Sequence, residues 1–297
     1  MSAPVSTNKP LLELASLEVI RQYEKKTGEP ITGLYFNKLM SLVYAELRNR
    51  YNINIELPHC WYRYGDEVVR YLMPNAIRWN HETPQYTTVT WVGQEPLTQR
   101  EEREIIKRVV KETIKKYEHK SKEELVDDVY SSAPFTFQRN FRQLRLNIEG
   151  MAVASVGISN FKEVLRSSLE QTIESFPKKE FPNEVYERIT NYYMLMKKLL
   201  ELPEFNVEIA KELTEDIWFY FSYYLRIHKK CYENIPRNVI EYWKSQLEFQ
   251  KNKFDRFFAE ILLTLNSKNI LFEGELQEIL EKRKQEKKEE LQFIENF

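Results

Sequence analysis

The chain has 297 residues, of which 42% are hydrophobic and 13% aromatic, and its formal net charge is −1. This apolar content is sufficient for a folded core and excludes a chain that is disordered throughout. The near-zero net charge excludes a whole-chain attraction to nucleic acid or to an anionic membrane, so binding of that kind must depend on a local patch.

Glycine is scarce, with seven residues in the whole chain. Loops that cradle phosphate need glycine because the backbone must approach the ligand closely and adopt positive φ angles. The sequence contains neither a G-x-G-x-x-G nor a G-x-x-x-x-G-K-[ST] pattern. A doubly wound nucleotide-binding fold is therefore not expected, and no cofactor is predicted.

Cysteine content and hydropathy indicate a cytoplasmic protein. Cys60 and Cys231 are far apart in the sequence, and two cysteines cannot build a disulfide framework or a cysteine-rich zinc site. We expect both to be reduced thiols. Residues 1–10 lack the apolar stretch of a signal peptide. No window approaches ~18 uninterrupted apolar residues, so no contact with a membrane is expected.

The N-terminal part of the chain combines helices with short strands. Apolar residues at helical spacing predict a helix from about Pro10 to Lys26 and a second from about Gly33 to Arg50. Apolar and polar residues alternate over Asn52–Leu57, which predicts a short strand or an extended stretch. Residues 58–97 are rich in aromatic and β-branched side chains, so we expect two or three short strands there, with Tyr86–Val92 as the best candidate.

Two helices follow, each with a predicted N-terminal cap. Thr98 with Glu101, and Ser121 with Glu124, have the Ser/Thr-x-x-Glu form of a capping box, and each pair precedes a run with helical periodicity. The second of these helices is expected to end before Pro134, because the residue that precedes a proline is disfavoured in helical conformation.

The C-terminal part reads as helices separated by prolines. The predicted helices are Asn160–Phe176, Asn183–Leu202, Val207–Glu233 and one that continues to about Leu265. The run Ile217–Leu225 is apolar or aromatic on all sides, which predicts a helix at the centre of a bundle.

The predicted fold is mainly α. An N-terminal α+β module with a small sheet, residues 1–150, is followed by an all-α helical bundle, residues 151–297, with a charged C-terminal helix over Glu275–Phe297. The boundary is placed near Gly150 because the stretch from Phe135 to Gly157 is mixed and contains two of the seven glycines. The charge run Glu278–Glu290 is interpreted as a solvated helix, with docking on a partner or on a second copy as the alternative.

The sequence assigns no metal ligand. The histidines have no metal-binding spacing, and partly exposed histidines without a role are the favoured interpretation. A zinc site made of His59, Cys60 and His81 is the alternative, because the two histidines could face each other across the strand-rich region.

No catalytic residue is assigned either, because no Ser/His/Asp or Cys/His arrangement is evident. Asp216, beside the aromatic run, is interpreted as a helix-edge residue that faces water, with a buried acid of perturbed pKa as the alternative. An enzyme with a dispersed site would leave no local signature and stays a third class of function.

Basic residues form the clearest surface pattern. Arg139, Arg142 and Arg145 recur every three residues, which on a helix predicts a one-sided stripe that could meet phosphate oxygens. A solvated face paired with neighbouring glutamates would have the same pattern. More basic residues precede the stripe on a predicted helix: Lys107, Arg108, Lys111, Lys115 and Lys116.

The N-terminal half also carries an ordered set of motifs. They are I-T-G-L-Y-F-N-K-L-M-S-L-V-Y over Ile31–Tyr44, W-Y-R-Y-G-D-E-V-V over Trp61–Val69, and K-Y-E-H-K-S-K-E-E-L-V-D-D-V-Y over Lys116–Tyr130. Together they resemble the Panacea domain, a helical family of antitoxins and antitoxin-like proteins of bacteria, archaea and phages. The family has a K-L-hydrophobic-Y/L helix, a G-P-V turn and a K-Y-x-x-x-S-x-x-x-L helix pair. The resemblance covers about 130 residues, which leaves the C-terminal bundle outside it.

The match departs from the family pattern at three places. Asp66 stands where the family prefers proline, Glu67 lengthens the turn, and Phe135 or Phe137 replaces a tryptophan. The resemblance implies a non-enzymatic interaction module that binds and restrains a partner protein, such as a toxin or a component of a toxin–antitoxin or antiviral defence system.

Aromatic and arginine side chains are the ones expected at a protein-binding surface. The densest such group outside the predicted bundle is Trp61, Tyr62, Arg63, Tyr64 and Tyr71. The core of the small sheet is the favoured interpretation of these rings, and this group is our candidate for a partner-binding surface if the chain has one. A nucleic-acid-binding protein that uses the stripe Arg139–Arg145 is the competing hypothesis for function, and the oligomeric state is left open.

Overall fold

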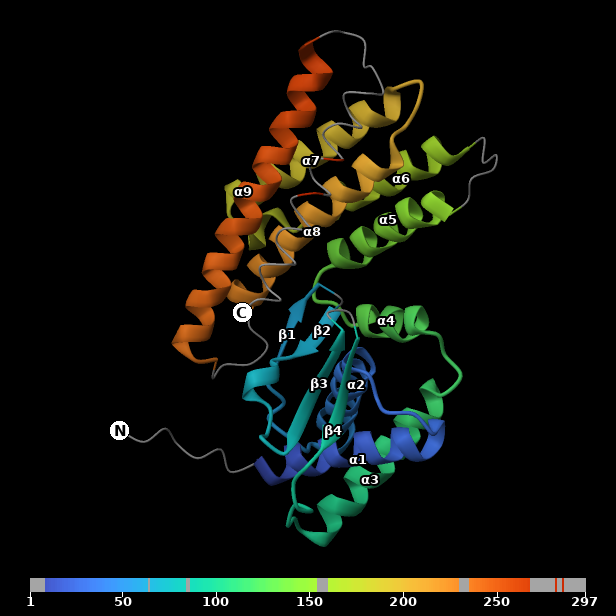
Figure 1. Cartoon of the computed structure of the whole chain (residues 1–297), viewed down its shortest axis with the longest axis vertical. Coiled ribbons are helices and arrows are strands. Elements are labelled where there is room, and N and C mark those ends of the chain that lie inside the picture. The colour runs from blue at the N-terminus through green and yellow to red at the C-terminus, as the bar shows by residue number, and fades with distance from the viewer. Residues whose placement is uncertain are drawn as a thin grey trace. The chain divides into compact units, whose positions relative to one another are not determined.

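The computed structural model describes residues 9–153, apart from Tyr64, Pro84 and Gln85, together with residues 160–229 and 235–267 and the single residues Glu281 and Gln285. Within this part the chain is mainly α-helical, with two small antiparallel two-stranded sheets (Figure 1). The predicted mainly-α fold with a small sheet region is confirmed. Among the described helices, none combines the length and the hydrophobicity that a membrane-spanning segment needs.

The chain divides into two compact units. Unit 1 consists of Met1–Ala133 with Leu225–Glu241, and unit 2 consists of Pro134–Tyr224 with Tyr242–Phe297. The division therefore precedes the boundary predicted near Gly150, which lies inside a helix. A single glycine inside a helix lowers the stability of that helix by only about 1 kcal/mol. This loss is too small to end a helix that also buries an apolar side.

Unit 1 packs three helices and a short fourth one against two β-hairpins (Figure 1). Its elements are α1 (Lys9–Thr27), α2 (Gly33–Tyr51), β1 (His59–Tyr62), β2 (Gly65–Val68), β3 (Ile77–Thr83), β4 (Tyr86–Trp91), α3 (Arg100–Tyr117) and α4 (Lys122–Ser131). Apolar faces of α1, α2 and α3 form its core, with Leu14, Phe36 and Val109 fully buried. The predicted strand near Tyr86–Val92 is confirmed as β4.

The β1–β2 hairpin depends on a glycine. Tyr62 is opposite Gly65 in its register, and Gly65 has a φ of +95°, which L side chains rarely adopt. A Cβ atom at this position would also lie 3.2 Å from the ring of Tyr130 in α4. Glycine is therefore required here both by the backbone conformation and by the packing of α4.

Of the short strand or extended stretch predicted over Asn52–Leu57, the strand does not form, because residues 52–58 pair with no strand. Asn52 and Glu56 have positive φ angles, 54° and 52°, which interrupt an extended conformation, and Asn52 closes α2 as its C-terminal cap. Ile55 and Leu57 are nevertheless buried. The alternation of apolar and polar residues therefore reflects which side chains are buried, and it does not indicate that this segment pairs with a strand.

One of the two predicted capping boxes is present. Ser121 and Glu124 exchange both hydrogen bonds at the start of α4, at 3.2 and 2.7 Å. The box predicted for Thr98 and Glu101 is wrong, because α3 begins at Arg100 and its N-cap residue, Gln99, makes no side-chain cap hydrogen bond. The helix starts too late in the sequence for the Thr98 hydroxyl to reach its first turn.

The regular elements in the described residues of unit 2 are all helices. It contains α5 (Thr136–Val153), α6 (Phe161–Glu174), α7 (Asn183–Glu201), most of α8 (Val207–His228) and most of α9 (Arg237–Ser267). The end of α8 and the start of α9 belong to unit 1. Almost all of the predicted helical segment Glu275–Phe297, including the charge run Glu278–Glu290, lies outside the described residues.

Aromatic rings fill the core of unit 2. Phe141 stacks on Trp218 at a centroid distance of 4.8 Å, and Phe137 meets Phe176 and Phe221 edge to face. The predicted central helix is confirmed, since all of Ile217–Leu225 except the half-buried Phe219 is buried.

The interpretation of Asp216 as a water-facing residue is wrong. Its side chain is 1% exposed, and it lies 3.8 Å from the ammonium of Lys253, which is itself 9% exposed. Both residues belong to unit 2, on α8 and α9. A buried carboxylate needs such a partner because removal of a charge from water is costly.

Candidate functional site

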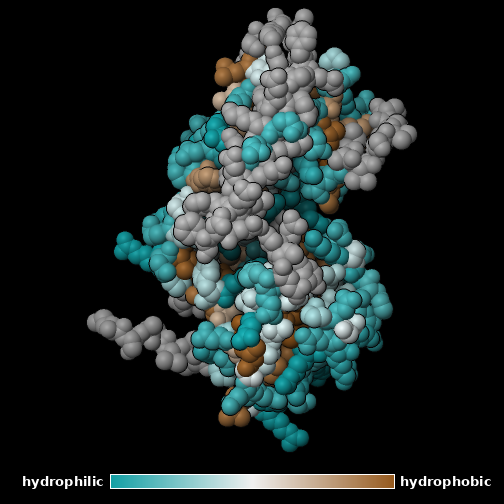
Figure 2. Space-filling model, viewed as in Figure 1, coloured by the Kyte–Doolittle hydropathy of each residue, from teal (hydrophilic) through white to brown (hydrophobic). Residues whose placement is uncertain are grey.

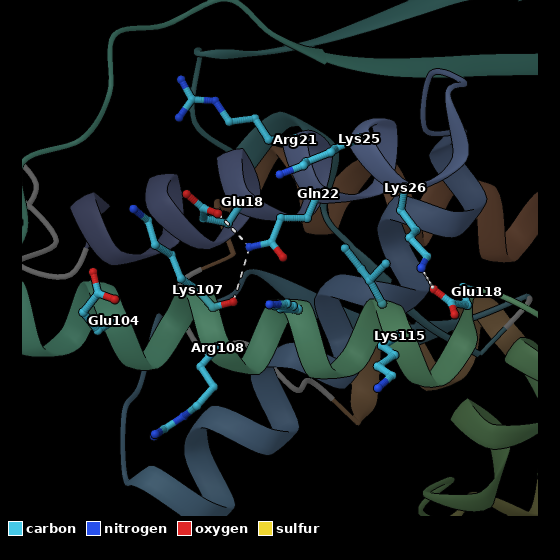
Figure 3. A pocket seen from close by; sticks show the side chains of 12 residues that line it. Glu18, Arg21, Gln22, Lys25, Lys26, Glu104, Lys107, Arg108, Lys115 and Glu118 are labelled. Carbon is cyan, nitrogen blue, oxygen red and sulfur yellow. Dashed lines mark hydrogen bonds and ion pairs between the residues drawn. The ribbon is translucent and has the colours of Figure 1, made fainter.

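A groove of about 750 Å³ lies between α1 and α3 in unit 1 (Figure 3). The two helices run side by side in the same direction, and their polar side chains line the groove. Seven lining residues are cationic and three are acidic, although the whole chain has a net charge of −1. The lining residues are Glu18, Arg21, Gln22, Lys25, Lys26, Glu104, Lys107, Arg108, Lys111, Ile114, Lys115 and Glu118. We call this hollow the α1–α3 groove.

Helical periodicity explains why these side chains converge. On α3, residues 104, 107, 108, 111, 115 and 118 recur at steps of three or four, which places them on one side of the helix. The opposite side of α3 buries apolar residues that include Ile106, Val109 and Val110. On α1, residues 18, 21, 22 and 25 follow the same rule. The apolar faces pack into the core and leave the basic faces along the groove.

Some groove residues are neutralised by partners. The ammonium of Lys26 lies 2.7 Å from a carboxylate oxygen of Glu118, and Arg21 pairs with Glu95 at 3.4 Å. The amide of Gln22 donates to Glu18 at 2.8 Å and to the carbonyl oxygen of Lys107 at 3.3 Å. These contacts hold the side chains of the groove wall in place, and they engage the carboxylates of Glu18 and Glu118 as hydrogen-bond or ion-pair partners.

Four lysines in the groove have no such partner. The ammonium groups of Lys25, Lys107, Lys111 and Lys115 make no ion pair and no hydrogen bond with any residue that the structure describes. The ion pair with Lys26 lowers the pKa of Glu118, so this carboxylate stays charged at neutral pH. The groove therefore presents an excess of uncompensated positive charge.

The other side of α3 has a different charge pattern. A second groove of about 410 Å³, between α2 and α3, is lined by two acids and two bases among its ten residues. The acids are Glu46 and Glu112, and the bases are Arg50 and Lys116. Arg50 pairs with Glu46 at 2.9 Å and approaches Glu112 at 3.9 Å. The charges of this α2–α3 groove balance, so the positive excess is confined to one side of α3.

The aromatic group predicted to bind a partner does not form one exposed surface. Trp61 is 7% exposed and packs against Tyr130, and Tyr62 lies under the guanidinium of Arg226 at 4.0 Å. The carbonyl of Arg63 accepts a hydrogen bond from the Tyr130 hydroxyl at 3.2 Å. Tyr71 is 57% exposed, whereas Tyr64 lies outside the described residues.

Exposed hydrophobic residues of unit 1 are few. In its described part, the exposed large hydrophobic side chains are Tyr71, Val92 and Leu97, of which Leu97 is 90% exposed. On the face seen in Figure 2, hydrophilic residues cover most of unit 1 and hydrophobic ones gather in small patches. The surface of unit 1 thus favours polar over apolar contacts.

The predicted arginine stripe on α5 is partly withdrawn from solvent. Arg145 has a side chain that is 12% exposed and lies 3.7 Å from Glu149, and Arg139 donates to the hydroxyl of Thr136 at 3.0 Å. Arg142 is half-buried. A step of three residues turns about 60° short of a full helical turn, so the stripe winds from the surface toward the buried face of α5.

The three residues of the alternative zinc site are not brought together. Nδ1 of His59 lies 2.8 Å from both carboxylate oxygens of Asp66, and Nδ1 of His81 lies 3.0 Å from the hydroxyl of Thr87. Cys60 follows His59 on the same strand, so its side chain points to the opposite face. Among the described residues, no three His, Cys, Asp or Glu side chains converge on a point where a metal ion could bind.

The thiol of Cys60 is buried and contacts a cation. It accepts a hydrogen bond from Nε of Arg226 at 3.1 Å. Burial raises the pKa of Cys60 to about 11, and the nearby Arg226 opposes this shift without reversing it. This cysteine therefore stays a neutral thiol at physiological pH.

Comparison with protein-family models, with curated proteins and with solved structures gives no match for this chain. The resemblance of the N-terminal half to the Panacea domain therefore stays a prediction. The α1–α3 groove is the feature that sequence reasoning identified only in part. The basic residues of α3 were evident from the sequence, but the contribution of Arg21, Lys25 and Lys26 of α1 was not.

Proposed function

We propose that the protein binds nucleic acid and holds the phosphate backbone in the α1–α3 groove. One observation carries this proposal: Lys25, Lys107, Lys111 and Lys115 line a single groove and form no ion pair with an acidic residue that the structure describes. Unpaired ammonium groups in a concave site attract a polyanion, because the release of its counterions favours binding.

The spacing of the lysines on α3 fits a regularly charged polymer. Lys107, Lys111 and Lys115 follow one another at four-residue steps, and each step advances about 6 Å along a helix. The row is thus about 12 Å long, whereas one strand of a nucleic acid rises about 3.4 Å per nucleotide. Such a row faces the phosphates of three to four consecutive nucleotides.

The type of side chain indicates contacts that do not depend on base sequence. Lysine presents a compact point charge on a flexible stem, without the fixed fork by which arginine recognises guanine. Phosphate contacts position a protein on nucleic acid but do not read sequence. We therefore expect affinity in the α1–α3 groove to depend on salt more than on sequence.

Two observations favour this proposal over the predicted alternatives. A protein that restrains a partner through the aromatic group would need its rings accessible, but Trp61 is buried and Tyr62 is covered by Arg226. Nucleic-acid binding by the arginine stripe would need three exposed guanidinium groups, but the side chain of Arg145 is 12% exposed. The antitoxin-like role is then supported by the Panacea resemblance alone.

The proposal is tested by fluorescence anisotropy with labelled oligonucleotides of mixed sequence. Four lysine–phosphate contacts on a duplex give a slope of log K against log salt of about −3 to −4. Lys111→Glu is expected to weaken binding about tenfold and to reduce the magnitude of that slope by about one. Lys116→Glu is the matched control, because it makes the same charge change on the same helix but lines the α2–α3 groove.

Three outcomes contradict the proposal. One is a salt-independent affinity, and another is an equal loss of affinity in Lys111→Glu and Lys116→Glu. The third is retention of an acidic polypeptide such as polyglutamate in preference to the oligonucleotides, which would assign the groove to a protein partner. A loss of affinity confined to Arg142→Glu would place the contact on α5 instead.

A further inference from the structure

A small aromatic pocket adjoins the α1–α3 groove. Its lining includes Ile114 and Glu118, which line the groove as well, so the two hollows meet at the C-terminal end of α3. The other lining residues are Tyr23, Thr27, Tyr35, Leu39, Tyr117 and Lys120. The pocket is therefore formed where α1, α2 and α3 come together, beside the positively charged groove.

Three tyrosines from three helices dominate this pocket. The rings of Tyr23 and Tyr35 have centroids 5.7 Å apart and are inclined at 47°, and Tyr117 is 6% exposed. Burial, with the hydrogen bond and negative charge of Asp128, raises the pKa of Tyr117 to about 12. The phenol is then neutral at physiological pH and places no negative charge beside the half-buried rings of Tyr23 and Tyr35, which are the accessible ones. Leu39 and Ile114 complete an apolar lining on which a flat ring can pack.

The size of the pocket limits what can enter it. Its volume is about 70 Å³, and about 10–15 Å³ of such space holds one water molecule, so the pocket holds about five waters. Five waters occupy about 150 Å³ of liquid, which is close to the space needed by a single nucleobase. A base pair is too large, and a base inside a duplex is stacked and paired, so it cannot reach the pocket without leaving the helix.

We propose that this pocket receives one unstacked base of a single-stranded nucleic acid whose phosphates follow the α1–α3 groove. The inference rests on the proposed function and adds to it the class of partner. Single-strand-binding proteins commonly combine a basic channel for the backbone with aromatic side chains for the bases, because every base has a π face. Here the junction at Ile114 and Glu118 places both elements side by side within unit 1.

The experiment compares affinities for a labelled single strand and for the corresponding duplex at one salt concentration. We expect the single strand to bind about tenfold more tightly than the duplex. Tyr23→Ala, which removes one ring, is expected to weaken single-strand binding on the order of tenfold and to leave duplex binding unchanged. Tyr71→Ala is the matched control, because Tyr71 is an exposed tyrosine of unit 1 that lines neither hollow.

A second variant guards against a loss of fold in Tyr23→Ala. Thr27 is exposed at the pocket lining, so Thr27→Trp is expected to obstruct the pocket without removing a core side chain, and to reduce single-strand affinity alone. Circular dichroism checks that both variants stay folded.

The two proposals fail in different ways. If Tyr23→Ala and Thr27→Trp leave single-strand affinity unchanged, or weaken strand and duplex equally, the base pocket is overturned. The groove proposal still stands in that case, provided Lys111→Glu weakens duplex binding. If neither form of nucleic acid binds the unaltered protein, the proposed function itself is wrong.

Discussion

The two grooves beside α3 differ in how their charges are paired. Toward α2, Arg50 is within 4 Å of two glutamates, and the groove there contains as many acids as bases. Toward α1, four lysines form no ion pair with an acid in the part of the chain that the structure describes. Exposed ion pairs contribute little to stability, so the difference has small consequences for folding. The difference has large consequences for the electrostatic potential in each groove, because the potentials of paired opposite charges cancel and those of unpaired like charges add.

The difference between the two grooves is tested most strongly by reversal of two charges in each groove, in separate variants. Lys111→Glu with Lys115→Glu is expected to lower affinity for labelled nucleic acid on the order of a hundredfold, since contacts at separate positions add. Arg50→Glu with Lys116→Glu changes the net charge by the same amount on the α2 side. We expect that variant to bind within twofold of the unaltered protein in anisotropy titrations. Equal losses in both variants would mean that only net charge matters.

Removal of an acid should act in the opposite direction. Glu104 lines the α1–α3 groove, and Glu104→Gln takes away one of its three carboxylates. The affinity is expected to rise about threefold at low salt, and the gain should disappear at high salt because screening shortens the reach of the charge. Glu112→Gln, in the α2–α3 groove, should leave the affinity unchanged. Weaker binding by Glu104→Gln would indicate that this carboxylate contacts the ligand directly.

The smallest expected effect concerns the ion pair that closes one end of the groove. Lys26 lowers the pKa of Glu118, so the folded protein binds this proton less readily than the unfolded chain does. The stability from the pair is present above the ordinary pKa of glutamate and is lost as pH falls through the lowered value. NMR titration of the Glu118 carboxyl carbon should show this low midpoint, and Lys26→Ala should move it upward. An unchanged midpoint in Lys26→Ala would show that the pair does not form.

Periodicity alone was sufficient for the helices and for half of the groove. The apolar positions of α1, α2 and α3 place their boundaries within a few residues, and the basic residues of α3 were evident as a cluster. The partner helix was not predictable, because the packing of α1 beside α3 depends on contacts between residues far apart in sequence. Lys25 becomes part of the groove only because α1 packs beside α3.

The failures share a physical cause. Asn52–Leu57 has the alternation of a strand, but it alternates because Ile55 and Leu57 are buried, and no strand lies beside it. Asp216 has the composition of a surface residue, but Lys253 of α9 compensates its charge inside unit 2. The spacing of Arg145 is that of a stripe, but its side chain lies toward the buried side of α5. In each case the local pattern is present in the sequence, but contacts with residues far along the chain determine the structure that results.

Unit 1 is discontinuous in sequence, since Leu225–Glu241 completes it. Arg226, in that segment, covers the ring of Tyr62 and donates to the sulfur of Cys60. A ribosome therefore adds Pro134–Tyr224 of unit 2 before it adds Leu225–Glu241, so the β1–β2 hairpin must wait for its arginine during synthesis. A shortened chain that ends at Ala133 would keep the α1–α3 groove but expose a buried thiol, and should be judged by its solubility as well as by its binding.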